Sequence, residues 1–225
     1  MPDKELYWCE IDVKNDDELN EFYILLTNNY VEDDDNTFRF DYSREFLRWA
    51  LTPPGYQPKW LVGIRNEKKE LVASITGVPV LTCVENDKIK MAEINYLCVH
   101  KNFREKNLTP ILITEVTRRV NLKDKWQAIY TAGRNLPTPF CRATYFHRSL
   151  NPKKLIEVKF SGLGPNQTLA MVKKLYNLPE EPTLKLRPMN KKDVFGVYEL
   201  VNQGLSYIFS YSENSRSSST SQRKK

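Results

Sequence analysis

The chain has 225 residues, and its 34 Lys and Arg against 28 Asp and Glu give a formal net charge of +6. This length fits one large domain, or one domain and part of a second. Hydrophobic residues make up 40% of the chain, enough for a packed core. No apolar run approaches the ~20 residues of a membrane-spanning helix, and no basic-then-apolar leader opens the chain. We therefore expect a soluble protein that is not addressed to the secretory pathway.

The positive charge is concentrated at the C-terminal end. Residues 211–225 have a net charge of +3, from one acid, Glu213, and the basic residues Arg216, Arg223, Lys224 and Lys225. A nucleic-acid-binding domain more often has a basic stripe on its folded surface. Nucleic acid is therefore a poor candidate partner.

The cysteines and histidines do not suggest a metal site. No two cysteines form a CxxC pair, and the histidines have no zinc-ligand spacing. These residues are Cys9, Cys83, Cys98, Cys141, His100 and His147. Four reduced thiols in an intracellular, cytoplasmic protein are expected.

Two helices are predicted near the N-terminus. Asn15 precedes three acids that would lie in the first turn of a helix, where the dipole favours negative charge. The buried face of this helix would contain Leu19, Phe22, Tyr23 and Leu26. Ser43 can cap a second, shorter helix, which Pro53 ends. Between the two helices, aromatic residues alternate over residues 38–42, a pattern typical of a half-buried strand.

The middle of the chain predicts an antiparallel meander followed by a helix. Strand-like segments occur at residues 59–65, 70–84 and 90–99, and the polar stretches 66–69 and 85–88 are typical of hairpin turns. After a polar loop, Thr109 would cap a helix with Pro110 at its first position. The buried row of that helix would contain Leu112, Val116 and Val120. Further along, strands are predicted at residues 127–131 and 155–160, and a helix at residues 168–177.

This order of elements predicts an α+β fold with a mixed, mostly antiparallel sheet flanked by helices. We expect one domain over residues 1–177. Residues 178–203 would form a linker and the start of a truncated second domain. The Ser-rich, basic residues 204–225 are expected to be disordered.

The segment from residue 93 to residue 110 is the best candidate for a ligand site. Its sequence is EINYLCVHKNFREKNLTP, in which a buried strand leads into a basic loop and then into a helix. The free N–H groups of a helix start bind phosphate well, so a nucleotide or coenzyme A would suit this place. Because no Gly-rich phosphate cradle is present, the spacing alone favours an ordinary connection with solvated charges.

Residues 93–101, EINYLCVHK, closely resemble the signature of the protein N-myristoyltransferases, the glycylpeptide N-tetradecanoyltransferases; Tyr96 stands where the family usually has Phe. Other motifs are similar and occur in the same order. They are YVEDDDN at 30–36, FRFDY at 38–42, TRRVNL at 117–122, YTAG at 130–133 and HRSLNPKKLIEVKF at 147–160. The resemblance extends from about residue 7 to about residue 201.

The resemblance implies an acyl-CoA N-acyltransferase fold, of the kind shared with the N-acetyltransferase superfamily. It also implies transfer of a myristoyl group from myristoyl-CoA to the N-terminal glycine amine of a protein, without a metal or a permanently bound cofactor. The backbone amides of Tyr96 and Leu97 would form the oxyanion hole. Asn95 and Thr131 would help to handle the amine.

A cofactor site and a peptide site are implied by the same resemblance. Residues that would line the thioester end of the cofactor are Tyr96, Leu97, Cys98 and Val99. Residues that would hold the coenzyme A phosphates are Arg104, Glu105, Lys106, Asn107, Leu108 and Thr109. Residues that would face the peptide are Tyr30, Asp33, Asp35, Phe38, Phe40, Tyr42, Tyr145 and His147.

Three positions of the phosphate site depart from the family pattern. Glu105 replaces the usual Ser, Asn107 the usual Arg, and Thr109 the usual Ala. A carboxylate beside phosphates and the loss of a guanidinium are both expected to weaken coenzyme A binding.

Without the resemblance, ordinary structural roles would be favoured for several of these residues. Residues 33–35 would form a solvated acidic turn, Cys98 would pack in a strand, and His147 would be structural. Two other functions stay open: a non-catalytic fragment that binds acyl-CoA or peptide, and a different acyltransferase of the same superfamily. The acidic loop argues against the second, because a small-amine acetyltransferase has no need of it.

Little or no transferase activity is expected of this chain. The resemblance includes neither the segment that precedes residue 7 in the family nor most of the second domain. The general base of the family is its C-terminal carboxylate, and it is needed because an α-amino group with a pKa of ~8 is mostly protonated at pH 7. A flexible cationic tail ending at Lys225 offers no route for such a carboxylate into the core.

Overall fold

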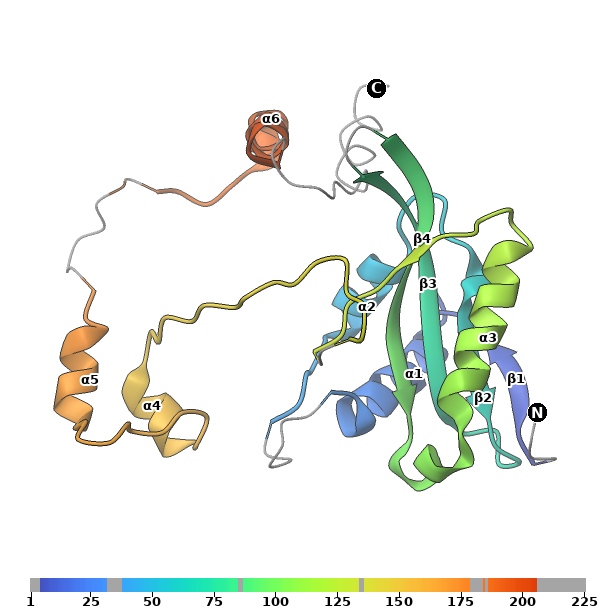
Figure 1. Cartoon of the computed structure of the whole chain (residues 1–225), viewed down its shortest axis with the longest axis horizontal. Coiled ribbons are helices and arrows are strands. Elements are labelled where there is room, and N and C mark those ends of the chain that lie inside the picture. The colour runs from blue at the N-terminus through green and yellow to red at the C-terminus, as the bar shows by residue number, and fades with distance from the viewer. Residues whose placement is uncertain are drawn as a thin grey trace. The chain divides into compact units, whose positions relative to one another are not determined.

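The structure is a computed structural model in which the chain forms two compact units (Figure 1). One unit contains Met1–Thr131 and Asn190–Lys225, and the other contains Ala132–Met189. The residues that the structure describes are 5–31, 38–84, 87–133, 136–178, 184 and 186–205.

Both predicted N-terminal helices are confirmed. Helix α1 spans Asp16–Asn29, and the side chain of Asn15 accepts hydrogen bonds from the N–H groups of Asp17 and Glu18 at 2.9 and 3.2 Å. Helix α2 spans Arg44–Leu51, and its cap is the Ser43 hydroxyl, which accepts from the Phe46 N–H at 3.2 Å. In each case a short polar side chain satisfies donors that the first turn leaves without partners.

The alternating aromatics before α2 do not form a strand. Within residues 38–42 there is a single bridge, at Arg39, and the Phe40 N–H donates to the Val31 carbonyl at 3.2 Å. Phe40 stacks on Tyr42 at 5.7 Å between centroids, as residues two apart on one face of an extended segment can do. The alternation therefore marks an extended segment whose rings share one face, without the ladder of a strand.

Five strands form one sheet in the order β1-β2-β3-β4-β5. Their bounds are β1 Tyr7–Glu10, β2 Leu61–Arg65, β3 Leu71–Val84, β4 Asp87–Val99 and β5 Ala128–Ile129. Strands β1 to β4 pair antiparallel and β5 pairs parallel to β4, so the sheet is mixed, as predicted.

The details of the meander differ slightly from the prediction. Residues 59 and 60 lie in the 3-10 helix η1, Pro58–Trp60, because Pro58 starts a turn there in place of a strand. The turn at residues 66–69 is present, and the Lys69 N–H donates to the Asn66 carbonyl at 2.9 Å. Of the second predicted turn, residues 85 and 86 lie outside the described part of the chain.

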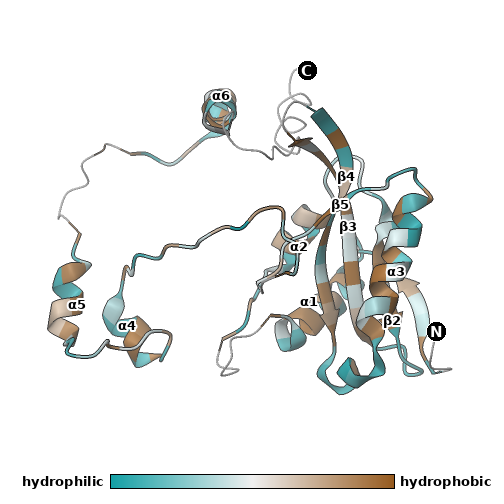
Figure 2. Cartoon of the chain, in the orientation of Figure 1, coloured by the Kyte–Doolittle hydropathy of each residue, from teal (hydrophilic) through white to brown (hydrophobic). Residues whose placement is uncertain are grey.

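Helices cover both faces of the sheet in this unit (Figure 1). Helices α1 and α2 enclose one buried cluster with β3 and β4, which includes Phe22, Leu47 and Tyr96. Helix α3, Leu108–Asn121, covers the other face with the predicted apolar row (Figure 2), whose members are Leu112, Val116 and Val120.

The start of α3 corrects one prediction. The residue before the helix is Asn107, in the left-handed conformation with φ 53° and ψ 36°, and Thr109 already lies inside the first turn. Asn is one of the few residues with a side chain that adopts this conformation readily, so the helix begins two residues earlier than the Thr-Pro pattern indicates. The predicted loop before it contains the 3-10 helix η2, Lys101–Lys106.

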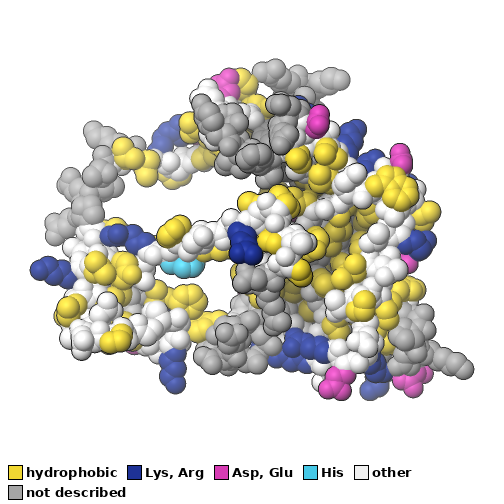
Figure 3. All heavy atoms as spheres, viewed as in Figure 1, with side chains coloured by type: hydrophobic (Ala, Val, Ile, Leu, Met, Phe, Trp, Pro, Cys, Tyr) yellow, Lys and Arg dark blue, Asp and Glu magenta, His cyan; other side chains and the backbone are white. Residues whose placement is uncertain are grey.

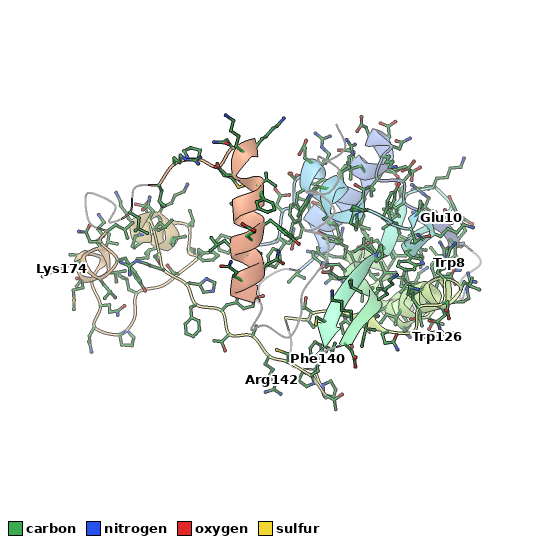
Figure 4. The ribbon with its side chains drawn as sticks, turned by 90° about the horizontal axis from the view of Figure 1, so that it is seen from above. Trp8, Glu10, Trp126, Phe140, Arg142 and Lys174 are labelled. Atoms are coloured by element: carbon green, nitrogen blue, oxygen red, sulfur yellow. The ribbon has the colours of Figure 1, made fainter. Side chains whose placement is uncertain are left out.

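The second unit contains a helix where a strand was predicted. Residues 155–157 lie in α4, Pro152–Glu157, and residues 158–160 follow it as turn and bend. The helix starts here because the Asn151 side chain accepts from the Lys154 N–H at 3.1 Å and Pro152 occupies the first helical position. The predicted helix at 168–177 is confirmed as α5, Leu169–Leu175, with Thr168 as its cap. Figure 4 shows Phe140 and Arg142 on the extended segment before α4, and Lys174 on α5.

Hydrophobic side chains are widespread on the surface of this second unit (Figure 3). Tyr145 and Phe146, for example, are 84% and 90% exposed. Beyond this unit, η3 spans Lys191–Asp193 and α6 spans Val194–Leu205. The domain boundaries at 177 and 203 stay predictions. Of the residues predicted to be disordered, 204–225, residues 204 and 205 lie in α6, contrary to the prediction, and the others lie outside the described residues.

An ionic network anchors α3 to the rest of the first unit. Glu115 accepts hydrogen bonds from Arg118 at 2.8 Å and from Arg119 at 2.6 Å, and Arg119 also donates to the Lys59 carbonyl at 2.9 Å. Glu10 of β1, labelled in Figure 4, lies 3.6 Å from the Arg119 guanidinium. The hydrogen bonds from Arg118, and then those from Arg119, lower the pKa of Glu115 from its ordinary value of 4.5 to about 2.

We predict that Glu115→Gln lowers the free energy of unfolding by about 1 to 2 kcal/mol at pH 7. A carboxylate with a lowered folded-state pKa stabilises the fold fully above its unfolded pKa, and this stabilisation is lost as the pH falls from 4.5 toward 2. Denaturant titrations at pH 7, 5 and 3.5 should therefore show the difference between wild type and variant shrinking at the lowest pH.

Glu67→Gln is the matched control, since Glu67 is an exposed glutamate of the hairpin turn after β2. It should leave stability unchanged at each pH. A Glu115→Gln protein as stable as wild type at pH 7 would contradict the anchoring role.

Candidate functional site

The site begins at an irregularity in the pairing of β3 with β4. The register passes from the pair Thr76–Asn95 to the pair Ser74–Cys98, so Ile75 stands opposite two residues, Tyr96 and Leu97. An extra residue of this kind is a β-bulge, which bends the strand and frees backbone groups from the ladder. Tyr96 has φ 50°, in the left-handed region that a bulky side chain rarely adopts.

Two buried hydroxyl groups of β3 hold the bulge. The Ser74 hydroxyl donates to the Tyr96 carbonyl and the Thr76 hydroxyl donates to the Asn95 carbonyl, each at 3.0 Å. Both side chains are buried, at 0% and 1% exposure. Sequence reasoning missed these residues, and the signal available was a Ser and a Thr on either side of Ile75 in a mostly apolar strand.

The predicted residues Tyr30, Asn95 and Tyr96 meet beside the bulge. The Asn95 side-chain oxygen accepts from the Tyr96 N–H at 2.9 Å and from the Tyr30 hydroxyl at 3.2 Å. The Tyr96 N–H thus points to a place that an oxygen atom can occupy. A ligand carbonyl that uses this donor has to displace the Asn95 amide.

Aromatic rings form a wall from the bulge to the surface. The ring of Tyr96 packs edge-on against Tyr42 at 5.6 Å and against Phe22 at 6.0 Å. Tyr42 in turn stacks on Phe40 and Phe46 at 5.7 and 5.4 Å. Tyr30 packs against Tyr96 at 6.0 Å and against Tyr42 at 6.4 Å. The wall therefore contains three predicted peptide-facing residues, Tyr30, Phe40 and Tyr42, and its outer ring, Phe40, is 54% exposed.

The phenols of this wall lie where burial disfavours their charged form. Desolvation raises the pKa of Tyr30, Tyr42 and Tyr96 above the ordinary value. The Tyr30 hydroxyl therefore stays protonated near neutral pH and can donate to Asn95. The remaining predicted aromatic, Phe38, is partly buried.

The predicted thioester-end residues lie on both faces of β4. Tyr96 and Cys98 belong to the cluster under α1 and α2, whereas Leu97 and Val99 pack against the cluster under α3. Burial raises the pKa of the Cys98 thiol to about 12, and its sulfur lies 3.9 Å from the Leu25 carbonyl oxygen. A thiol with such a pKa is a poor nucleophile at neutral pH. Cys98 therefore packs in the core, as the sequence suggests when the resemblance is set aside.

The basic loop after β4 is tied to the end of α1 by Asn29. The Asn29 side chain donates to the Leu25 carbonyl at 2.9 Å and accepts from the Lys101 N–H at 3.0 Å. The Asn29 carbonyl accepts from the Arg104 guanidinium at 3.0 Å. Asn29 is buried and was not predicted from the sequence, where nothing distinguishes it from its neighbour Asn28.

The predicted phosphate-site residues differ in what they can offer a ligand. Leu108 is buried at 1% exposure, so its side chain belongs to the core and its backbone alone can face a ligand. The exposed residues are Arg104, Glu105, Lys106, Asn107 and Thr109. The first turn of α3 contains no acidic residue, and the Asn107 side chain makes no capping hydrogen bond. Free N–H groups at the start of a 14-residue helix are suited to an anion.

Other predicted site residues are not brought to the bulge by described contacts. Thr131 is exposed and follows the parallel pair formed by Glu93 and Ile129. Tyr145 and His147 are exposed residues of the second unit. Asp33 and Asp35 lie outside the described residues. The roles of these five residues stay predictions.

Within the part of the chain that the structure describes, no three His, Cys, Asp or Glu side chains are grouped so that they could hold a metal ion. The described helices include none long and apolar enough to cross a membrane.

The fold matches solved structures of an acyltransferase. A crystal structure of Saccharomyces cerevisiae N-myristoyltransferase with bound myristoyl-CoA aligns with a TM-score of 0.85 and 43% sequence identity, covering 94% of this chain and 52% of that one. The mixed sheet flanked by helices is thus the acyl-CoA N-acyltransferase fold, similar to that of the N-acetyltransferases.

Family models match in two consecutive stretches. Residues 2–143 match the N-terminal domain of myristoyl-CoA:protein N-myristoyltransferase, and residues 157–217 match its C-terminal domain. The chain belongs to this family.

Two curated relatives show how much of such a protein is present. Glycylpeptide N-tetradecanoyltransferase 1 of Arabidopsis thaliana is 55% identical over 201 residues, which are 88% of this chain and 46% of the relative. The glycylpeptide N-tetradecanoyltransferase of Dictyostelium discoideum is 52% identical over 200 residues, with 88% and 48% covered. The chain therefore spans about half the length of the curated relatives it matches.

We predict that Glu105→Ser strengthens coenzyme A binding about threefold to fivefold. Glu105 is exposed in the basic loop, where its charge would repel a phosphate with an energy of about 1 kcal/mol at short range in water. Calorimetric titration with coenzyme A should show the gain at low salt and a smaller gain at high salt.

Glu67→Ser, at the exposed hairpin turn, is the control and should bind coenzyme A as wild type does. Unchanged affinity in Glu105→Ser at low salt would argue against phosphates beside this residue.

Proposed function

We propose that this chain provides the acyl-CoA site and the acyl-transfer centre of a glycylpeptide N-tetradecanoyltransferase. The observation that supports the proposal most directly is the β4 bulge, where the Tyr96 N–H faces a position already occupied by an oxygen atom. A helix start and a basic loop follow within a few residues. This order suits a thioester whose carbonyl enters the bulge and whose coenzyme phosphates reach α3.

In the proposed reaction, a neutral glycine amine attacks the thioester carbonyl carbon of myristoyl-CoA. Negative charge develops on the carbonyl oxygen, and the backbone N–H groups of Tyr96 and Leu97 stabilise it. The C–S bond then breaks, coenzyme A leaves as the thiol after taking up a proton, and the amine nitrogen loses a proton as the amide forms. Burial raises the pKa of the Cys98 thiol, which disfavours an acyl-Cys98 intermediate, so we propose direct transfer.

The acceptor would lie along the aromatic wall. Tyr30 and Tyr42 provide apolar ring faces close to the bulge, and Asn95 offers an oxygen that can accept from the incoming amine once the Tyr96 N–H is released. We further place the protein in the cytoplasm, in keeping with its free cysteines, Cys9, Cys83, Cys98 and Cys141.

A single-turnover assay tests the proposal even when transfer is slow. The 225-residue chain is mixed in excess over myristoyl-CoA with a glycine-led peptide, and mass spectrometry should detect N-myristoyl peptide. The same peptide with an acetylated N-terminus should give none. Binding of myristoyl-CoA without any product would favour the non-catalytic binding function, and absence of binding would overturn the proposal.

We also predict that Asp33→Asn combined with Asp35→Asn weakens binding of peptides with basic residues after glycine, by about fivefold to tenfold at low salt. Neutral peptides should be affected much less, and added salt should reduce the difference. Both residues lie outside the described part of the chain, so this prediction rests on the family resemblance. Fluorescence anisotropy with matched basic and neutral peptides is the measurement, and equal losses for both would contradict a groove role.

A further inference from the structure

We infer that Ser74 and Thr76 are positioning residues that aim the two backbone donors of the bulge. The inference rests on the proposed function and adds the groups that set the geometry of its oxyanion hole.

Each proposed donor shares a planar peptide unit with the carbonyl of the residue before it. The Asn95 carbonyl lies in the same planar unit as the Tyr96 N–H, and the Tyr96 carbonyl lies in the same unit as the Leu97 N–H. Thr76 donates to the first of these carbonyls and Ser74 donates to the second, each at 3.0 Å. Each hydroxyl therefore fixes the orientation of one peptide unit by holding its carbonyl. The N–H group of the same unit, on the opposite side, is one of the two proposed donors.

Ordinary strand pairing cannot perform this task at the bulge. Ile75 is the one residue of β3 that stands opposite both Tyr96 and Leu97, so a regular ladder would leave the extra residue without a partner. The left-handed conformation of Tyr96 is also a conformation that the surroundings must hold. Two side-chain hydroxyls on either side of Ile75 provide the missing hydrogen bonds.

The hydroxyls also affect donor strength. A hydrogen bond to a peptide carbonyl polarises the whole amide, so its N–H becomes a better donor. Because both hydroxyls are buried, water does not compete with them for the carbonyls. They thus act on the oxyanion through the backbone and never touch the substrate.

The test uses Thr76→Val, which removes the hydroxyl with little change in shape, and Ser74→Ala as an independent second variant. Thr76→Ser restores the hydroxyl. Thr82→Val is the matched control, because Thr82 is another buried threonine of β3 and pairs with Ile89, away from the bulge. Amide spectra of each variant establish that the chain is folded.

Two probes isolate the carbonyl contribution in the full 225-residue chain. One is a non-hydrolysable ketone analogue of myristoyl-CoA, in which a methylene group is inserted between the sulfur and the carbonyl carbon. The other is the S-tetradecyl thioether of coenzyme A, which has no carbonyl oxygen. The ratio of the two affinities reports the hydrogen bonds made to that oxygen.

We expect wild type to prefer the ketone, and this preference to fall about fivefold in Thr76→Val and in Ser74→Ala, as for the loss of a good hydrogen bond. Thioether affinity should stay within about twofold. Thr76→Ser and Thr82→Val should retain the full preference. In the free protein, the carbonyl ¹³C resonance of Asn95 should move upfield in Thr76→Val, and that of Tyr96 in Ser74→Ala.

Three results would overturn the inference. They are an unchanged ketone preference in both variants, an equal loss in Thr82→Val, and a wild type that binds both probes with no preference for the carbonyl. If wild type binds neither probe, the proposed function itself fails, and the ¹³C shifts of the free protein still decide whether the two hydroxyls hold the bulge.

Discussion

The pairing of β3 with β4 is the constraint on which the site depends. These are the two longest strands, at 14 and 13 residues, and their ladder runs from the hairpin end at Val84–Asp87 to the pair Ala73–Val99. One extra residue in β4 interrupts it. If the ladder continued without the bulge, every side chain of β4 after Tyr96 would move to the opposite face of the sheet. Cys98 would then leave the cluster under α1 and α2, and Leu97 would leave the cluster under α3. The bulge is therefore held by the packing of both faces as well as by its own hydrogen bonds.

Much of the fold follows from signals that are local in the sequence. Asn15, Ser43 and Thr168 are each followed by a helix because a short polar side chain can satisfy the first free N–H groups. The apolar row on α3 is equally visible. The wrong strand at residues 155–160 shows how such signals can be overlooked, because the β-branched residues after Asn151 and Pro152 suggest a strand, while those two residues start a helix. Local capping decided the structure there.

The candidate site was less predictable, for a physical reason. The segment from Asn95 to Leu97 could be identified by its resemblance to a family. The bulge, however, could not be predicted from the pattern of apolar residues, because it depends on which residue of β3 lies opposite. The partners of Asn95 and Tyr96 are 19 and 22 residues earlier in the chain, on another strand. Asn29 is further still, 72 residues from Lys101. Contacts between such distant residues depend on how the backbone folds, and the identity of Asn29 alone does not predict them.

Asn29 and Tyr30 are consecutive residues, yet they serve opposite ends of the site. Asn29 holds the loop that leads to the start of α3 through Lys101 and Arg104, and Tyr30 reaches Asn95 beside the bulge. The C-terminal end of α1 and its cap residue thus contact both the basic loop and Asn95 beside the bulge. If a ligand at the loop moves the Asn29 backbone, the Tyr30 backbone moves with it, because the two residues share a peptide bond. If the loop ligand changes the affinity of a second ligand at Tyr30 by some factor, thermodynamic reciprocity requires that the second ligand change the affinity of the loop ligand by the same factor. Communication between the two halves of the site therefore needs no domain movement, because a single peptide bond at the end of one helix connects them.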